Sequence, residues 1–138
     1  ACSTAKKAAV DTVDDVYTGS DTIEFLAKGV PDRVFFATNK SKLTTRSRDT
    51  LRKQATFLRK NKDITVTLEG HADERGTREY NLALGERRAN AAKDYLMTYG
   101  ISGKRISVIS YGKEKPINPA SSPLAWSQNR RSVTIKAN

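Results

Sequence analysis

The sequence lacks the features by which several common classes of protein are recognised. It has one cysteine and one histidine, so it can form no internal disulfide and cannot complete a zinc site of the usual His and Cys type. No apolar run approaches the ~20 residues that a membrane-spanning helix needs. It also contains no Gly-x-Ser-x-Gly turn, no Cys/His pair and no phosphate-binding glycine loop. We therefore expect a protein without metal or cofactor that is not an enzyme.

The chain is also poor in acidic residues relative to basic ones. Its 138 residues carry a formal net charge of +10, and 37% of them are hydrophobic, which fits a single folded domain. Most of the excess charge lies in residues 40–62, where nine lysines and arginines face Asp49 alone. Such a block attracts anionic partners, but it is more often a solvated helix face. A nucleic-acid-binding module is therefore an alternative, although no aromatic-basic motif of an RNA-binding sheet accompanies the charge.

The first 20 residues differ in composition from the remainder. They are rich in Ala, Ser, Thr, Lys and Asp and show no sustained period, so we predict a flexible tether over 1–20 and a folded domain over 21–138. Cys2 stands directly after the small residue Ala1. A thiol at a chain end can be incidental, or it can be the acceptor of a lipid, since lipid attachment requires a small residue before the cysteine.

Hydrophobic periodicity predicts six elements in the order β-α-β-α-β-β. Strands are expected near residues 34–36, 64–68, 106–112 and 133–137, and helices at about 45–61 and 78–99, the second capped by Thr77. Residues 21–29 are expected to form a helical turn or an irregular segment. Residues 113–132, with three prolines, are expected to form a loop. This order predicts an α+β, two-layer fold with a mixed four-stranded sheet packed against helices.

The second predicted helix places two adjacent arginines in different surroundings. On a helical wheel its apolar stripe consists of Leu82, Gly85, Ala89, Ala92 and Leu96. Arg88 falls at the margin of this stripe and Arg87 falls opposite it. A charge at a core margin needs an anionic partner, and Asp73 is the candidate. The pair is either a structural salt bridge or a split site, in which Asp73 holds an ammonium and Arg88 a carboxylate of one ligand.

Two aromatic side chains, those of His71 and Trp126, are expected to have structural roles. His71 is close to Asp73 and Glu74, but consecutive residues around a turn rarely converge on one ion, so we expect a loop-stabilising hydrogen bond. Trp126 is expected to cover an edge of the core.

A long stretch around Asp73 and Arg88 resembles the signature of OmpA-like domains. The stretch is Gly70-His71-Ala72-Asp73-Glu74-Arg75-Gly76-Thr77-Arg78-Glu79-Tyr80-Asn81-Leu82-Ala83-Leu84-Gly85-Glu86-Arg87-Arg88-Ala89. Its segment from Asp73 to Gly85 resembles the peptidoglycan-associated lipoprotein branch in particular. Two further segments match in order, Ser110-Tyr111-Gly112-Lys113-Glu114-Lys115-Pro116 and Asn129-Arg130-Arg131-Ser132-Val133. The resemblance covers about residues 32–137.

This resemblance implies a role and a set of site residues. It implies that Asp73 and Arg88 grip the diaminopimelate side chain of the peptidoglycan stem peptide, with Thr38, Asn39, Arg75 and Leu84 as further ligand-binding residues. The family usually has an acidic residue where this sequence has Asn39, so Asp73 is expected to do more of the electrostatic work here.

The resemblance also implies a place in the cell and partners. Cys2 would carry the lipid, anchoring the protein in the outer membrane so that the domain faces the periplasm and holds the membrane to the cell wall. TolB and other Tol proteins would be its protein partners, in a system that maintains the envelope and supports cell division. A wall hydrolase is a further alternative, but no catalytic motif favours it.

Overall fold

The computed structural model describes residue 10 and residues 15–138 of the chain. Its elements, in chain order, are β1 (Phe25–Ala27), β2 (Val30–Pro31), β3 (Arg33–Phe35), α2 (Thr45–Lys60), β4 (Val66–His71), α3 (Arg78–Thr98), the 3-10 helix η1 (Gly103–Arg105), β5 (Ile106–Gly112), α4 (Pro123–Asn129) and β6 (Arg131–Lys136). The six predicted elements are all present. None of the helices in the described ranges is both long and apolar enough to cross a membrane.

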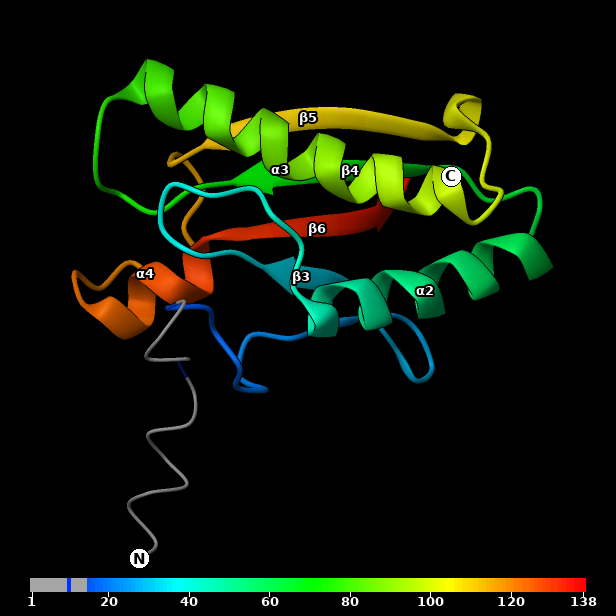
Figure 1. The fold of residues 1–138 in the computed structure, drawn as a ribbon, viewed down its shortest axis with the longest axis horizontal. Coiled ribbons are helices and arrows are strands. Elements are labelled where there is room, and N and C mark those ends of the chain that lie inside the picture. The colour runs from blue at the N-terminus through cyan, green and yellow to red at the C-terminus, as the bar shows by residue number, and fades with distance from the viewer. Residues whose placement is uncertain (1–9, 11–14) are drawn as a thin grey trace, which may run out of the picture.

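Four strands form one mixed sheet in the order β3-β6-β4-β5. β6 is antiparallel to both of its neighbours, whereas β4 and β5 run parallel. The last strand of the sequence therefore lies inside the sheet, between two strands that precede it. α2 and α3 lie across one face of the sheet, and α4 lies at one end (Figure 1). The predicted α+β two-layer architecture is confirmed.

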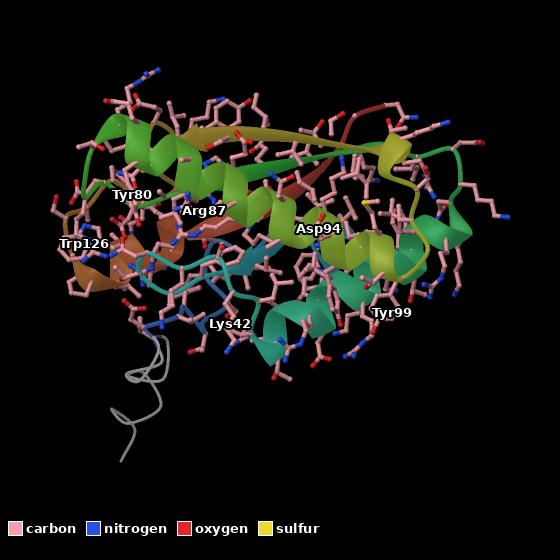
Figure 2. The ribbon with its side chains drawn as sticks, turned by 45° about the horizontal axis from the view of Figure 1, so that its top comes forward. Lys42, Tyr80, Arg87, Asp94, Tyr99 and Trp126 are labelled. Carbon is pink, nitrogen blue, oxygen red and sulfur yellow. The ribbon has the colours of Figure 1, made fainter. Side chains whose placement is uncertain are left out.

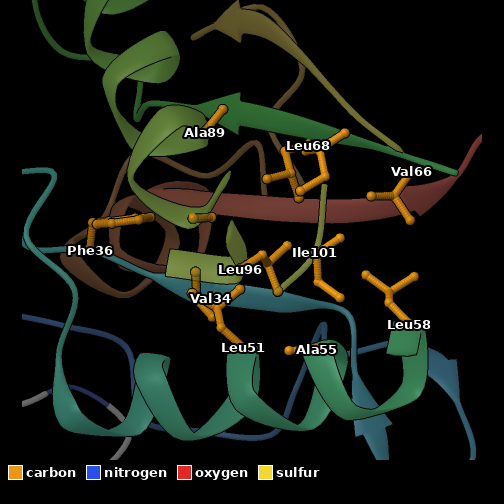
Figure 3. Close-up of a cluster of buried hydrophobic side chains, with 12 residues drawn as sticks. Val34, Phe36, Leu51, Ala55, Leu58, Val66, Leu68, Ala89, Leu96 and Ile101 are labelled. Atoms are coloured by element: carbon orange, nitrogen blue, oxygen red, sulfur yellow. The ribbon is translucent and has the colours of Figure 1, made fainter. Parts of the chain in front are cut away.

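The core forms between the sheet and the two long helices. Alternation along β4 turns Val66 and Leu68 toward the helices, since successive side chains of a strand point to opposite faces. Figure 3 shows them packed with apolar side chains of the other elements, which include Val34, Phe36, Leu51, Ala55, Leu58, Ala89, Leu96 and Ile101. Removal of this apolar surface from water is the main force that holds the layers together.

Both long helices begin at a threonine cap. Thr44 accepts a hydrogen bond from the backbone N–H of Ser47, and Thr77 accepts one from that of Tyr80, so the predicted Thr77 cap is confirmed. After α3 the chain turns at Gly100, whose φ of +89° suits glycine. The Thr77 cap fixes the first residue of α3, and the site described below lies beside this end of the helix.

α3 approaches β4 more closely than side chains would permit. A Cβ atom on Gly70 would collide with the backbone of Gly85, and one on Gly85 would collide with Gly70 and with the side chain of Ser110. Glycine at both crossing points allows the backbone of the helix to lie directly against the strand.

Three sequence predictions are wrong in detail. Residues 21–29 contain β1, which pairs with β2 as a small antiparallel sheet. The predicted loop over 113–132 contains α4, because Ser122 caps a helix whose first residue is Pro123, and proline is compatible with the first helical turn.

The folded part also begins before residue 21. Val16 and Tyr17, assigned to the tether, are buried against Phe35. Residues 1–9 and 11–14 of the predicted tether, including Cys2, lie outside the described residues.

Candidate ligand-binding site

A cavity of about 260 Å³ lies where β4 ends and α3 begins. It is lined by Thr38, Asn39, Ala72, Asp73, Arg75, Gly76, Tyr80, Asn81, Leu84 and Arg88. The six residues that the sequence singled out for ligand binding are all among them. Figure 2 shows Tyr80 and Trp126 at this end of the molecule, with Asp94 and Tyr99 toward the other end. We call this space the ligand cavity.

Arg88 is fully buried and binds backbone rather than a carboxylate. Its Nε donates to the carbonyl oxygen of Lys40 at 2.9 Å, one Nη to that of His71 at 2.9 Å, and the other Nη to that of Ala37 at 3.0 Å. Three of the five N–H groups of the guanidinium are used in this way. The two others, one on each Nη, have no protein acceptor in the described part of the chain and can serve a ligand that enters the cavity.

Of the two alternatives for this pair, the structural salt bridge between Arg88 and Asp73 does not form, because Asp73 pairs with Arg75 and Arg130 instead. The helical wheel placed Arg88 at the core margin and assumed that only an anion could compensate its charge. Three carbonyl dipoles do so instead, because the chain brings two segments to the same side of α3. Burial, followed by the nearby charge of Arg130, lowers the pKa of Arg88 to about 9, so the side chain remains a cation at neutral pH.

Asp73 is buried and is held by two other arginines. One of its carboxylate oxygens accepts from the backbone N–H of Arg75 at 3.0 Å and from Arg75 Nε at 3.1 Å. The other accepts from Arg75 Nη at 2.8 Å and from Arg130 Nη at 3.1 Å. Burial opposes ionisation of Asp73, but these hydrogen bonds outweigh it and keep the pKa of its carboxyl below the ordinary value. Asp73 is thus an anion with a fixed orientation.

The loop between β3 and α2 forms one wall of the cavity. It turns tightly, with the N–H of Lys40 donating to the carbonyl of Ala37 at 3.2 Å. Asn39 has a φ of +60°, a left-handed conformation that asparagine adopts more readily than most residues. The hydroxyl of Thr38 accepts from Arg75 Nη at 3.1 Å. Since Arg88 also binds two carbonyls of this loop, it ties the loop to α3 and to the end of β4.

Trp126 packs against Arg75 of the cavity wall and belongs to neither apolar cluster of the described residues, so the prediction that it covers an edge of the core is wrong. Its indole N–H donates to a carboxylate oxygen of Glu74 at 2.7 Å, and the guanidinium of Arg75 lies 4.2 Å from its ring centroid. Lys113 donates to the carbonyl of Gly76 at 2.6 Å. α4 and the segment after β5 thus hold the β4–α3 loop, and this contact depends on a helix that the sequence did not predict.

His71 is buried beside the site without entering it. Its Nε2 lies 3.2 Å from a carboxylate oxygen of Glu69, and its ring stacks on Tyr111. Burial, with the positive charges of Arg131, Arg33 and Lys115, lowers the pKa of His71 to about 3, so the ring is neutral near pH 7. Across residue 10 and residues 15–138, no three His, Cys, Asp or Glu side chains converge as metal ligands.

Sequence reasoning missed Asn81 in the cavity wall and Arg130, which binds Asp73 from outside the lining. Asn81 is buried in the first turn of α3 and donates to the carbonyl of Arg75 at 2.8 Å. Its polarity kept it out of the apolar stripe, although it lies one turn before Gly85 and therefore on the same side of the helix. Arg130 belongs to a matched segment of the sequence, but its contact with Asp73 bridges residues 57 positions apart. No local pattern indicates such a contact.

The cavity joins two opposite charges across an apolar wall. Asp73 provides the anion, Arg88 the cation with free donors, and Leu84 and the ring of Tyr80 the apolar surface. This arrangement suits a slender ligand that carries both an ammonium and a carboxylate. The lining contains no histidine, cysteine or serine, and its one aliphatic hydroxyl, that of Thr38, is already hydrogen-bonded. The geometry is that of a binding site.

A family model described as the OmpA family matches residues 35–130, well over half of the chain. The chain belongs to the OmpA family. Its relatives include a peptidoglycan-associated lipoprotein from Rhizobium meliloti (strain 1021), which is 53% identical over 106 residues covering 77% of this chain and 60% of the relative. Another from Mesorhizobium japonicum is 50% identical over 105 residues, covering 76% and 62%. The chain thus spans about 60% of the length of these curated relatives.

Solved structures agree with this OmpA-family assignment. The peptidoglycan-associated lipoprotein from Burkholderia pseudomallei superimposes with a TM-score of 0.74 at 32% identity, covering 76% of this chain and 89% of that chain. The C-terminal domain of Helicobacter pylori MotB has a TM-score of 0.72 at 21% identity, covering 78% and 84%, and so shares the fold. The resemblance inferred from the motif around Asp73 and Arg88 is confirmed.

Proposed function

We propose that this OmpA-family domain binds peptidoglycan non-catalytically, by taking the diaminopimelate side chain of a stem peptide into the ligand cavity. The observation that carries the proposal is the pairing of a buried carboxylate with a buried guanidinium that retains free N–H groups. Diaminopimelate bears an ammonium and a carboxylate on the end carbon of a short aliphatic chain. The names of the relatives, which refer to association with peptidoglycan, favour the same ligand.

In the proposed complex each pole of the ligand has its own partner. The ammonium lies against Asp73 and the amide oxygen of Asn39, and the carboxylate accepts from the free N–H groups of Arg88. The aliphatic carbons lie along Leu84. Arg75, which is itself bound by Thr38, holds the carboxylate of Asp73 in the orientation that the ammonium requires.

We further propose that the domain tethers an outer membrane to the wall. The word lipoprotein in the relatives' names supports a lipid on Cys2. A single acyl chain binds a membrane only marginally, so stable anchoring implies several chains on the same terminus. The domain would then face the periplasm, with TolB and other Tol proteins as partners.

Nucleic-acid binding is the alternative that the basic block suggests, and the structure weakens it. Several of its arginines are occupied within the protein. Arg48 donates to the carbonyl of Leu43 and Arg59 to that of Tyr99, while Arg52 pairs with Asp49. These contacts leave the charges in place, but the block offers fewer free N–H donors to a phosphate backbone than the sequence suggests.

One experiment separates the two functions. The full chain is mixed with purified sacculi and, in parallel, with duplex DNA, each at 50 and 200 mM salt, together with the Asp73→Asn variant. We expect retention by sacculi that changes little with salt and is lost in the variant, because a zwitterion in a cavity releases few counterions. Tight DNA binding that falls steeply with salt and is unchanged by Asp73→Asn would support nucleic-acid binding. Clearing of the sacculus suspension would instead indicate a hydrolase.

A further inference from the structure

Asp15 makes a set of long-range contacts at the point where the N-terminal segment joins the domain. One of its carboxylate oxygens accepts from the backbone N–H of Thr38 at 3.0 Å, and the other accepts from the hydroxyl of Thr38. Arg130 Nη lies 3.6 Å from a carboxylate oxygen of Asp15 and donates to its backbone carbonyl. Three parts of the chain that are remote in sequence therefore meet at this residue.

The two partners of Asp15 are also partners of the residues around the ligand cavity. Thr38 gives its hydroxyl proton to Asp15 and accepts from Arg75, while Arg75 and Arg130 both bind the carboxylate of Asp73. The contacts close a ring through Asp15, Thr38, Arg75, Asp73 and Arg130. Asp15 does not line the cavity, so it acts on a ligand through the other members of this ring.

The charges in the ring explain why a second carboxylate matters. Without Asp15, the carboxylate of Asp73 would face the cations of Arg75 and Arg130, with Arg88 across the cavity. An arriving ammonium would then meet an excess of positive charge. Asp15 offsets Arg130 from the side opposite to the cavity, which leaves more of the charge of Asp73 for a ligand. About half of the Asp15 side chain is exposed, so this contribution is reduced by water but not abolished.

Packing of its neighbours holds Asp15 in place. Val16 and Tyr17 are buried, and the ring of Tyr17 packs edge-on against Phe35 with centroids 4.9 Å apart. Asp15 itself has a φ of +49°, a conformation that only a few residue types adopt readily. The segment is thus anchored by apolar contacts, and the carboxylate is directed to Thr38 and Arg130.

We propose that Asp15 is a positioning residue for the ligand cavity, which holds Thr38 and neutralises Arg130 so that Asp73 can bind an ammonium. The inference rests on the proposed function for the identity of the ligand. It also assigns to the N-terminal segment a part in ligand binding, beyond connecting the domain to what precedes it.

The test compares Asp15→Asn with the parent in calorimetric titrations of two probes. One is meso-diaminopimelate, and the other is pimelate, which has the same carbon chain and carboxylates but no ammonium groups. Asparagine is chosen because it tolerates the left-handed backbone at this position. We expect diaminopimelate to bind on the order of fivefold more weakly to the variant, the scale of a partly exposed ion pair, while pimelate binds as well as before or better.

Asp21→Asn is the matched control, since it removes the same charge from the same N-terminal segment. The side chain of Asp21 makes no contact with the ring of residues around Asp15, so this variant should bind both probes as the parent does. Equal diaminopimelate binding by the parent and Asp15→Asn, or an equal loss for both probes, would overturn the inference. If the parent binds neither probe, the proposed function fails. The inference is then decided on the free protein by NMR, where Asp15→Asn must shift the Thr38 amide and the Arg75 and Arg130 Nε–H signals. Unshifted signals would refute it.

Discussion

Arg88 shows how a buried charge can be satisfied without a counter-ion. Three carbonyl oxygens surround its guanidinium, and they come from the β3–α2 loop and from the last residue of β4. The side chain therefore has a structural role and a binding role at once. Its removal should therefore affect the fold as well as ligand binding.

Arg88→Ala should both destabilise the domain and abolish retention by sacculi. The substitution leaves a cavity and deprives three carbonyls of their donor, so we expect a loss of about 3–5 kcal/mol in the free energy of unfolding. Urea denaturation measures this loss. Arg87→Ala is the control, because Arg87 is adjacent but exposed, and it should change stability by no more than about 0.5 kcal/mol. A larger effect from Arg87 than from Arg88 would refute the assignment.

Asn39→Asp should tighten binding of free diaminopimelate severalfold. The left-handed backbone at position 39 suits aspartate as well as asparagine, so the fold should tolerate the change. A carboxylate there would attract the ligand ammonium, although it would also repel Asp73 and raise the pKa of both groups. Calorimetry on the two proteins measures the balance. Unchanged or weaker binding would mean that Asn39 does not face the ammonium.

Because of His71, we expect the free energy of unfolding of the domain to depend on pH between 5 and 7. Its pKa is about 3 in the folded protein, against an ordinary value of 6.5, so the unfolded chain takes up a proton in this range and the folded one does not. The contribution of neutral His71 to the free energy of unfolding is present in full above pH 6.5 and is lost as the pH falls below that value. Lowering the pH from 7 to 5 should cost about 2 kcal/mol.

Denaturation curves at both pH values test this, with His71→Gln as the control. The variant should lose much less stability over the same interval, because carboxyl groups titrate mainly below pH 5. An equal loss in both proteins would assign the effect to other groups.

The candidate site was predictable as a set of residues but not as a set of contacts. The six residues proposed from the sequence meet around one cavity because the motif around Asp73 and the loop at Asn39 each follow a strand of the same sheet. The anionic partner expected for Arg88 and the role expected for Trp126 were wrong, and the roles of Asp15 and Arg130 were missed. Each of these depends on contacts between distant segments, for which periodicity carries no signal.

At the level of elements, long periodic segments were predictable and short ones were not. α2 and α3 were predicted to within about one residue of their observed bounds because each buries one face, which leaves a regular pattern in the sequence. The β1–β2 hairpin and α4 are too short to show a period. They form because the rest of the fold packs against them, and the prolines around α4 indicated a loop.

Gly85→Ala should destabilise the contact between α3 and β4. A methyl group would collide with the backbone oxygen of Gly70, and strand and helix would have to separate. We expect a loss of about 1–3 kcal/mol in unfolding free energy, which exceeds the gain in helix propensity of up to about 1 kcal/mol. Thermal unfolding measures it, with the exposed Glu86→Ala as the matched control. A stabilised Gly85→Ala would show that the crossing can relax at little cost.

At the level of the whole molecule, a hollow larger than the ligand cavity lies elsewhere on the domain. A groove of about 690 Å³ lies between the N-terminal segment, β3 and the start of α2, and much of its polar lining is basic, including Lys40, Lys42 and Lys53. It offers no carboxylate opposite these cations except Asp49. We therefore assign it and the exposed basic side of α2 to general attraction of anionic surfaces and not to selection of a ligand.

Neutralising Arg52, Lys53, Arg59 and Lys60 to glutamine should weaken association with sacculi modestly and mainly at low salt. These charges act through a field that salt screens over about 10 Å at 0.1 M, whereas the ligand cavity is unaffected. Sedimentation with sacculi at two salt concentrations measures the effect, and titration with free diaminopimelate, which should not change, is the control. Binding abolished at physiological salt would show that the basic surface is part of the site.

The position of β6 has a consequence for the order in which parts of the domain can fold during synthesis. β6 follows the other three strands of this sheet in the sequence, yet it lies between β3 and β4, so the β4–β5 pair and β3 are not connected until β6 is present. Arg130, which binds Asp73, belongs to the same terminal segment. A chain that is made from its N-terminus can form local helices early, but the four-stranded sheet can form only after β6 has been made. β3 and the β4–β5 pair are therefore joined only after β6 has been made, and the same segment supplies the contact of Arg130 with Asp73 beside the ligand cavity.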